Sequence, residues 1–437
     1  MKAFSKRMLK ILLIVRRRQA RKRSLLIKRR WGVRPVLRER KRVGEFYVSF
    51  LKYKIIDHEW FFLYTRMTPA QFDTLLSIVG PLLCKNSNRE PLSPAQRLAI
   101  TLRYLSQGDS IFSIASGYKI GRSTASVVLR ETMDAIWEAL NNLVFKKWTE
   151  NYLKRISEDF ITKWDFPHTI GAIDGKHVNI KCPNNSGSSF FNYKKNFSII
   201  LMAVSDAHYN FTYIDVGAYG SQSDGGVFRN CSLGKALYQN KIPVPPQECL
   251  PQSNIDMPHF FVADDAFSLG KYIMKPFKGL NLSDMQLIFN YRLSRARRII
   301  ENAFGILVAR WQIFTRTITC SPQKVDKIIK ASVCLHNFIK KLEYNIHESR
   351  KKYCSKTFCD KETDDGVIPG EWRREVGTSF NVILRDTQKI GKGGNNPGTT
   401  ALNLRNGLGQ YLISPAGSIP NQIKHINRGK KLRNLNM

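Results

Sequence analysis

Residues 169–182 of this chain read Thr-Ile-Gly-Ala-Ile-Asp-Gly-Lys-His-Val-Asn-Ile-Lys-Cys. An apolar run leads into Asp174, and Gly175 directly after it permits a sharp exit of the backbone. The pattern predicts strands over residues 168–173 and 177–181, with Asp174 at a strand end. A carboxylate held at such a point suits a metal ligand. Taken alone, the Asp-Gly pair is more often an ordinary turn.

Two further acidic residues lie in contexts that folding could bring to the same point. Asp264 follows the apolar run 259–263, which predicts another strand, and Glu301 lies in residues 294–313, which predict a long helix. Three converging carboxylates repel one another unless cations neutralise them. Mg²⁺ or Mn²⁺ would do so, and in a basic chain a phosphodiester is the matching substrate. We therefore predict Asp174, Asp264 and Glu301 as catalytic metal ligands.

Each of the last two acids has a competing interpretation. Asp264 is followed by Asp265, and only one of two adjacent strand residues can face the site. We favour Asp264, with Asp265 kept as an alternative ligand. Glu301 could instead pair with Arg297 or Arg298 on the helix surface.

Three other residues extend this candidate site. Asp224 precedes a predicted helix, where it either caps the helix or assists the metal, and the capping role is favoured. His177 either contacts a substrate phosphate or is simply packed. Arg297 is a further candidate for DNA contact.

The composition favours a polyanionic partner. The 437 residues include 70 Lys and Arg against 34 Asp and Glu, a formal net charge of +36. Such an imbalance opposes compaction and suits DNA. A cationic ribosome-like or membrane-surface protein is the alternative.

The positive charge is concentrated at the beginning of the chain. Residues 1–45 contain only two acids, Glu39 and Glu45, and we interpret this segment as a disordered basic arm. Its Lys/Arg clusters favour residence in the nucleus, with a mitochondrial presequence as the competing interpretation. The apolar run Ile11–Val15 is too short to span a bilayer, so no membrane association is expected.

Residues 46–155 predict a helical domain. Thr68 and Ser93 each precede a proline and a helical pattern, which is typical of helix caps. Three helices within residues 93–140 are similar to a helix-turn-helix. Its DNA-reading positions would be the exposed polar residues that begin the third helix: Arg122, Ser123, Thr124 and Ser126. Alternatively, this block packs on the rest of the protein and touches no DNA.

Residues 156–345 predict an α/β domain. Residues 199–205 and 211–218 are expected to form a hairpin across a polar turn, giving a mixed sheet flanked by helices. Residues 346–437 are rich in Asn, Gly and Lys and are expected to be mostly disordered.

The order of motifs along the chain carries a family resemblance. These motifs are Ala172-Ile-Asp-Gly-Lys-His177, Gly220 to Asp224, Ala263-Asp-Asp-Ala-Phe267, Asn290-Tyr-Arg-Leu-Ser294 with Arg297, Glu301-Asn-Ala-Phe-Gly305 and Leu335-His-Asn-Phe338. Together they resemble the PIF/Harbinger transposases and Harbinger-derived nucleases. The resemblance departs at residues 263–267, where the family pattern is usually Gly-Asp-Ser-Gly/Ala-Tyr.

The resemblance implies a fold, a site and partners. The fold would be RNase H-like, with a DDE triad on Asp174, Asp264 and Glu301 that uses a divalent metal. It also implies nuclear residence and a separate Myb-like protein for DNA targeting. The expected activity is a two-metal DNA endonuclease or transposase. The alternative is a domesticated, non-cutting DNA- or chromatin-associated scaffold.

Overall fold

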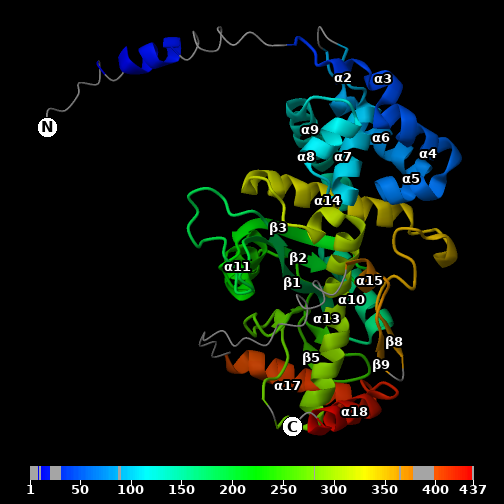
Figure 1. Cartoon of the computed structure of the whole chain (residues 1–437). Helices are drawn as coiled ribbons and strands as arrows, with labels where there is room; N and C mark the ends of the chain where they lie inside the picture. The colour runs from blue at the N-terminus through cyan, green and yellow to red at the C-terminus, as the bar shows by residue number, and fades with distance from the viewer. Residues whose placement is uncertain are drawn as a thin grey trace.

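The computed structural model describes residues 8, 11–19, 31–86, 90–279, 281–363, 366–376 and 398–435. Predictions that fall on other residues, including most of the basic arm and residues 377–397 of the tail, lie outside the described residues. Figure 1 shows a helical body, in blue and cyan, beside an α/β body that contains the central sheet. Helix α14 (Pro322–Leu342) lies where the two meet.

The helical body is built from short helices with defined starts. Its elements are α2 (Pro35–Arg38), α3 (Arg40–Val43), the π-helix η1 (Phe46–Phe50), α4 (Leu51–Ile56), α5 (His58–Thr65), α6 (Pro69–Leu83), α7 (Pro94–Gln107), α8 (Ile111–Gly117) and α9 (Arg122–Val144). Thr68 and Ser93 form capping boxes with Gln71 and Gln96, so both predicted caps are confirmed.

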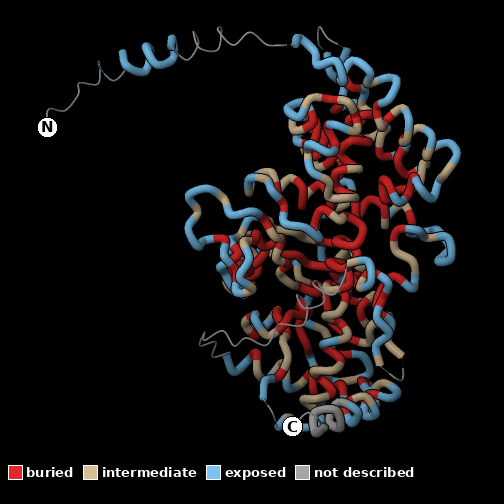
Figure 2. The backbone as a smooth tube through the Cα atoms, viewed as in Figure 1, coloured by how far each residue is buried: buried red, intermediate tan, exposed pale blue. Residues whose placement is uncertain are grey.

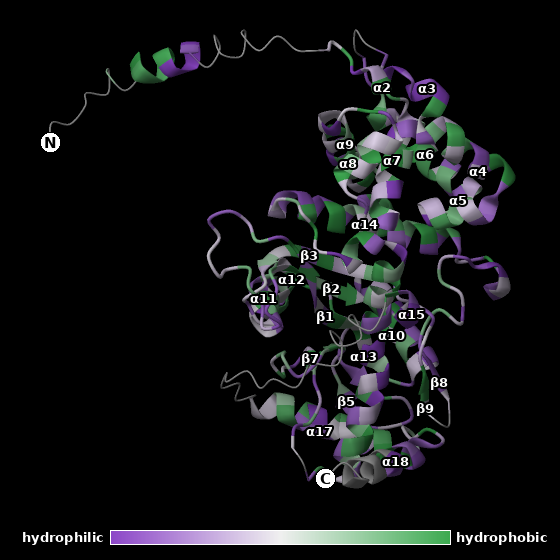
Figure 3. Cartoon of the chain, in the orientation of Figure 1, coloured by the Kyte–Doolittle hydropathy of each residue, from purple (hydrophilic) through white to green (hydrophobic). Residues whose placement is uncertain are grey.

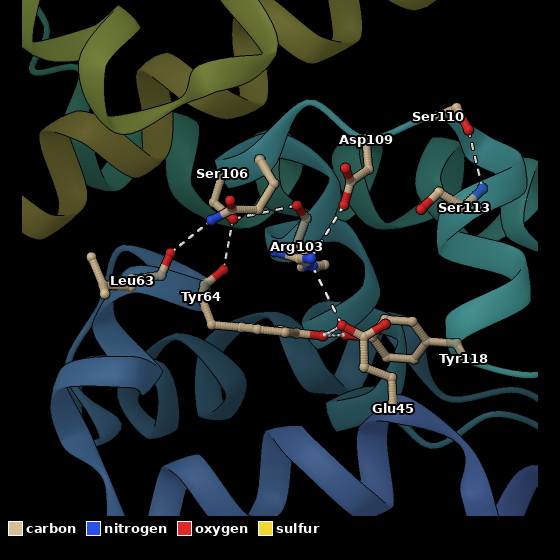
Figure 4. Close-up of polar contacts among 10 residues, drawn as sticks. Glu45, Leu63, Tyr64, Arg103, Ser106, Asp109, Ser110, Ser113 and Tyr118 are labelled. Atoms are coloured by element: carbon tan, nitrogen blue, oxygen red, sulfur yellow. Dashed lines mark hydrogen bonds and ion pairs between the residues drawn. The ribbon is translucent and has the colours of Figure 1, made fainter. Parts of the chain in front are cut away.

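The helical body begins before residue 46, because Glu45 belongs to its interior (Figure 4). The Tyr64 hydroxyl donates to Glu45 Oε1 at 2.8 Å and lies 2.5 Å from the Tyr118 hydroxyl. Arg103 forms ion pairs with Glu45 at 3.4 Å and with Asp109 at 3.3 Å. Residues 11–19 and helices α2 and α3 are also helical. The prediction of a disordered arm over residues 1–45 is therefore wrong for these described parts.

The α/β body contains a mixed five-stranded sheet in the order β3-β2-β1-β6-β7. These strands are β1 (Thr169–Asn179), β2 (Ser198–Ser205), β3 (Phe211–Tyr219), β6 (Phe260–Val262) and β7 (Ile273–Met274). Strand β1 runs antiparallel to β2 and parallel to β6, and β2 and β3 form the predicted hairpin. Two minor sheets pair β4 (Glu248–Cys249) with β5 (Asp256–Met257) and β8 (Lys361–Thr363) with β9 (Gly366–Ile368).

The first predicted strands are in fact one continuous strand. Asp174 lies in the middle of β1, opposite Ala203 of β2, and not at a strand end. Pairing with β2 continues past Gly175, so the expected backbone exit does not occur there. On the other side, however, pairing with β6 stops at Ala172–Val262. Strand β1 thus loses its β6 neighbour just before Asp174, and this leaves room for other groups beside that carboxylate.

Helices cover this sheet. Strand β1 contacts both α10 (Glu150–Trp164) and α13 (Asp284–Arg310), and α14 contacts β3. Buried residues, red in Figure 2, lie along the interior of both the helical body and the α/β body, and the sheet, α13 and α14 carry much of the hydrophobic colour in Figure 3. Helix α10 crosses the predicted boundary at residue 155, because its apolar face packs on β1. Two short helices, α11 (Asp224–Asn230) and α12 (Ser232–Tyr238), follow β3, and η2 (Gln312–Thr315) follows α13.

Helices α7, α8 and α9 match the predicted helix-turn-helix block in extent, but part of α9 faces the α/β body. The Ser126 hydroxyl accepts from Lys324 Nζ of α14 at 3.3 Å, and Asp134 pairs with Lys327 at 2.6 Å. Ser126 is therefore a packing residue and not an exposed DNA reader. Arg122, Ser123 and Thr124 are exposed, and their contact with DNA stays a prediction.

The tail is more ordered than its composition suggests. It contains η3 (Glu348–Arg350), α15 (Trp372–Val376), α17 (Thr399–Ile413) and α18 (Gln422–Leu435). Tyr353 and Trp372 are fully buried, as are Leu408 and Leu412 of α17, and α13 contacts α15, α17 and α18. The prediction that residues 346–437 are mostly disordered is wrong for the described parts, because a few large side chains anchor them on α13.

Within the described residues, no helix has both the length and the apolarity needed to cross a bilayer.

Candidate active site

One stripe of helix α13 lies over the central part of strand β1. Arg297, Glu301 and Phe304 follow one another at helical spacing, so they share a face of α13. Lys176 Nζ lies 5.9 Å from the centre of the Phe304 ring, and both Arg297 and Glu301 act electrostatically on Asp174. Asp174 and Lys176 are two residues apart on β1, so their side chains point to the same side of the strand. That side faces the stripe of α13 formed by Arg297, Glu301 and Phe304.

Asp264 and its neighbour Asp265 have different surroundings. The Asp264 side chain is buried and accepts a hydrogen bond from Ala266 N at 2.9 Å. Asp265 is more exposed and forms ion pairs with Lys275 at 3.4 Å and Lys278 at 2.8 Å. Asp264 also raises the pKa of Asp174. This geometry favours Asp264 over Asp265 as the residue that shares a site with Asp174.

Asp224 is not a helix cap, contrary to the favoured interpretation. The N-cap of α11 is Ser223, whose Oγ accepts from Gly226 N at 3.3 Å. Asp224 is the first residue of the helix, and among the described residues its buried Oδ1 has no hydrogen-bond partner. A cap needs only a side-chain oxygen next to the helix N–H groups, and the adjacent serine supplies it.

Two glycines allow Asp224 to approach the other acids. A Cβ atom on Gly175 would overlap the Asp224 carboxylate, and a Cβ atom on Gly225 would overlap the carbonyl oxygen of Ala266. The start of α11 is therefore in close contact with β1 at residue 175 and with the turn that carries Asp264. The Asp-Gly pair at 174–175 serves this close approach and not a turn.

The four carboxylates interact electrostatically. The pKa of Asp174 is raised well above its usual value by burial, then by Asp264, Asp224 and Glu301, while Arg297 opposes the rise. Burial and then Asp264 raise the pKa of Asp224 to about 7. Burial also raises the pKa of Asp264. The fold thus gathers four acids, contributed by β1, α11, the loop after β6 and α13, into one poorly solvated region.

Arg297 is the cation within this acid cluster. It forms an ion pair with Glu301, and its side chain is only 19% exposed. Burial lowers the pKa of Arg297, but Glu301, Asp174 and Asp264 together outweigh this effect and raise it. The alternative pairing of Glu301 with Arg297 is therefore observed, although in a largely buried position. Arg297 faces the carboxylates, so this geometry does not support its predicted contact with DNA.

The donor set fits a hard divalent cation. All four candidate ligands are carboxylates, and the buried, unpartnered Asp224 Oδ1 is an oxygen that a cation would satisfy. In the described parts of the chain, no three His, Cys, Asp or Glu side chains are already arranged to hold an ion. Two effects keep the four carboxylates from lying close enough together to hold an ion. The acids repel one another, and Glu301 is paired with Arg297.

His177 is held in its neutral form. Its Nδ1 lies 2.8 Å from Ser198 Oγ, and burial, with Lys194 and Lys176, lowers its pKa to about 4. A neutral, packed ring is a poor phosphate-binding cation, so the packed interpretation agrees better with the structure. Arg122, Ser123 and Thr124 belong to α9 in the helical body and are not among the residues brought to the acid cluster (Figure 1).

Comparison with known proteins shows which proteins this chain resembles. Residues 173–337 match the family described as DDE superfamily endonuclease, a span that includes all four acids. The chain is 28% identical to "Protein ALP1-like" of Arabidopsis thaliana, over 64% of this chain and 70% of that protein. It is 23% identical to "Putative nuclease HARBI1" of Homo sapiens, over 62% of this chain and 74% of that protein. Over its central part, the chain is therefore similar to the Harbinger-derived DDE endonucleases.

A further relative has a name that refers to chromatin. "Antagonist of like heterochromatin protein 1" of Arabidopsis thaliana is 25% identical over 57% of this chain, which spans 63% of that relative's length. No solved structure matches the chain.

Three residues near the acids were not predicted from the sequence. Lys176 is buried beside Asp174, and burial lowers its pKa to about 7. Lys194 opposes the raised pKa of Asp224, and Tyr193 packs against His177. Tyr193 and Lys194 belong to an aromatic and basic run, residues 190–197, that could have marked them in the sequence. This run lies within the long connection between β1 and β2.

Proposed function

We propose that this chain is a divalent-metal-dependent DNA endonuclease of transposase origin that hydrolyses phosphodiester bonds. The observation that carries this proposal is the convergence of Asp174, Asp224, Asp264 and Glu301 around Arg297 in a strongly basic chain. The order β3-β2-β1-β6-β7, with one antiparallel and one parallel neighbour for β1, supports the further inference that the sheet is RNase H-like.

The acids would hold the metal, with Asp174, Asp264 and Glu301 as the triad and Asp224 as a fourth ligand. Two bound cations would supply activation of the attacking water and stabilisation of the leaving oxygen. The Gly175 N–H and Ala266 N–H groups, each 2.9 Å from the carboxylate oxygen that it binds, fix the directions of Asp174 and Asp264. Each of these carboxylates keeps its second oxygen for another ligand.

Arg297 would position Glu301 and limit repulsion among the acids. Its guanidinium is paired with Glu301 from one turn earlier on α13 and is attracted by Asp174 and Asp264. Charges in a poorly solvated site interact strongly, so this cation keeps the acids together before any metal binds. Arg297 is therefore a positioning residue in this proposal.

A nicking assay on supercoiled and linear duplex DNA tests the function. With Mg²⁺ or Mn²⁺, the full chain, alone or with its targeting partner, should nick DNA. Asp174→Asn and Asp264→Asn should lose at least 100-fold in rate, on the order of a lost metal ligand. Asp265→Asn is the matched control and should retain activity, because Asp265 is engaged by Lys275 and Lys278. Absence of nicking by the wild-type chain under all these conditions would falsify the proposal.

One observation favours a second candidate function, a non-cutting, chromatin-associated scaffold. The Arg297–Glu301 ion pair neutralises one member of the triad without metal. A protein that kept the fold but not the cutting activity would need its acids neutralised in this way. The name of the heterochromatin-related relative agrees with this reading. In that case Asp174→Asn would leave DNA or chromatin binding and the cellular phenotype unchanged. If the Asp174→Asn variant still binds DNA but no longer supports the cellular phenotype, the nuclease function is favoured over the scaffold function.

We also propose nuclear residence and DNA targeting with a separate Myb-like partner. The net charge of +36 supports a polyanionic environment, and the family resemblance supports the partner. A fluorescent fusion of the full chain should concentrate in the nucleus. Mitochondrial accumulation would instead support the presequence interpretation of the basic arm.

A further inference from the structure

The connection between β1 and β2 contains a tightly held turn at residues 190–197. Asn192 is buried at its centre, and its Oδ1 accepts from Lys194 N at 3.0 Å and Asn196 N at 3.1 Å. Its Nδ2 donates to Ser198 Oγ at 2.8 Å. Asn192 N also donates to Asn196 O at 2.8 Å, and Lys195 N donates to Asn192 O at 3.0 Å. These bonds fix the backbone of the turn in one conformation.

The turn presents aromatic rings and ammonium groups at the surface. Tyr193 is 58% exposed and Phe191 is 42% exposed, although both are large aromatic residues. The Tyr193 ring meets the His177 ring edge-on at 5.7 Å between centroids, and Lys194 Nζ lies 5.2 Å from the centre of the Tyr193 ring. Lys195 is also exposed. The result is a fixed, partly exposed aromatic ring flanked by positive charge.

This turn lies near Asp224, one member of the acid cluster. Gly175 and His177 are two residues apart on β1, so they point to the same side of the strand, opposite to Asp174 and Lys176. The Asp224 carboxylate lies against Gly175, and Tyr193 lies against His177.

We propose that the turn at residues 190–197 is a nucleotide clamp, in which Tyr193 stacks on an unpaired base next to the scissile phosphate and Lys194 and Lys195 hold the adjoining phosphates. This inference rests on the proposed function and names the substrate form that the site takes. A base exposes its face to a protein ring only when it has left the stack of a duplex. Aromatic stacking combined with cationic backbone contacts is how proteins bind single strands with little sequence preference.

A binding experiment tests the clamp without cleavage. The full chain in chelator is titrated against fluorescent oligonucleotides that are single-stranded, fully paired, or paired with one unpaired base. Tyr193→Ala should weaken binding of the first and third about tenfold, in the range of a lost stacking contact. Binding of the fully paired duplex should change little, and Tyr193→Phe should bind like wild type. Lys194→Gln should flatten the log–log salt dependence for single strands by about 0.7.

Tyr344→Ala is the matched control. Tyr344 is 71% exposed and also meets a histidine ring edge-on, that of His208 at 6.3 Å, beside a different cavity lined by Trp164 and Lys340. Its removal should not change binding, and circular dichroism should show that all variants fold.

The outcomes separate the clamp from the nuclease. Equal loss of binding for paired and unpaired DNA in Tyr193→Ala, or no loss for either, overturns the clamp even if the wild-type chain nicks DNA. Selective loss in a chain that never nicks DNA supports the clamp and contradicts the nuclease. A wild-type chain that binds no form of DNA contradicts both.

Discussion

At the scale of single residues, the site concentrates negative charge in a poorly solvated place. Asp174 is raised in pKa by burial and by three neighbouring acids, with Arg297 as the opposing influence. Such an arrangement costs stability in the absence of metal, because the ionised acids repel one another. Substitutions in the acid cluster should therefore change the stability of the metal-free chain and its cutting activity in different directions.

We predict that Asp174→Asn stabilises the metal-free chain. The amide keeps an oxygen to accept from Gly175 N and removes an acid whose ionisation is disfavoured by burial and by its neighbours, so the unfolding free energy should rise by about 1–2 kcal/mol. Chemical denaturation in chelator measures this. Adding Mn²⁺ should raise the melting temperature of wild type more than that of the variant. Destabilisation by Asp174→Asn in chelator would contradict the repulsion.

Arg297 should show the opposite behaviour. Arg297→Gln leaves Glu301, Asp174 and Asp264 without their cation, and we expect a loss of about 3 kcal/mol without metal. Mg²⁺ or Mn²⁺ should recover part of this loss, since the ion replaces the missing charge. Arg316→Gln, at an exposed position of the same body, is the control and should change stability little. A loss for Arg297→Gln that metal does not reduce would argue against a cation-dependent cluster.

At the scale of elements, helix α13 connects the site to the tail. Glu301 lies on the stripe that faces β1, while four residues later Gly305 receives the ring of Trp372 from α15. The Trp372 Nε1–H donates to Asn302 Oδ1 at 2.8 Å. One helix thus carries a catalytic candidate and, one turn further along, anchors residues 372–376.

We predict that Gly305→Ala is destabilising through this contact. A Cβ atom there would lie 2.5 Å from the Trp372 ring, so the variant should lose about 1–3 kcal/mol of unfolding free energy. A smaller side chain at Trp372 should reduce the penalty in a double-mutant cycle. Gly270→Ala has open space around the new methyl group and should be close to neutral. Additive effects of Gly305→Ala and Trp372→Leu would contradict direct contact.

Elements with strong local signals could be predicted from sequence, and those set by distant contacts could not. The caps at Thr68 and Ser93 were predictable because a capping box depends on four consecutive residues. The position of Asp174 in mid-strand was not, since it depends on the pairing of β1 with β2, which continues past Gly175. Asp224 was misassigned for the same reason: its place beside Gly175 is a long-range contact.

At the scale of the whole molecule, a buried hydrogen-bond network joins the hairpin turn, α14 and the tail. His336 Nε2 lies 2.9 Å from the Tyr209 carbonyl and Nδ1 lies 3.2 Å from the Tyr353 hydroxyl. The Trp311 Nε1–H donates to that hydroxyl at 3.1 Å. The carbonyl can only accept, so Nε2 carries the proton and Nδ1 accepts from Tyr353.

We predict acid sensitivity from this network. Burial, with Lys340, lowers the pKa of His336 to about 3, and burial lowers that of His259 to about 4. The unfolded chain then binds more protons between these values and about 6.5, so stability is full above pH 6.5 and falls as the pH decreases. For His336 the loss at pH 5 should be about 1–2 kcal/mol. His336→Asn should be less stable at pH 8 but lose less between pH 8 and 5. If wild type and His336→Asn lost the same unfolding free energy between pH 8 and 5, His336 would not be the source of the acid sensitivity.

The order of the tail could not be predicted from its composition. Residues 346–437 contain few large apolar side chains, but Tyr353, Trp372 and Leu412 are completely buried. Average hydrophobicity does not reveal which few residues find a partner; here α15, α17 and α18 contact α13, and Tyr353 contacts His336 and Trp311. The acid triad was accessible to sequence reasoning because its motifs are ordered, whereas the clamp at residues 190–197 required the geometry.

Anomalous diffraction from crystals of the full chain bound to DNA in Mn²⁺ tests the central claim most directly. We expect anomalous peaks between the carboxylates of Asp174 and Asp264, with Glu301 or Asp224 as a further ligand. Each Mn–O distance should be about 2.0–2.2 Å. Saturating Mn²⁺ with no peak between these acids, or with peaks only at other surfaces, would contradict it.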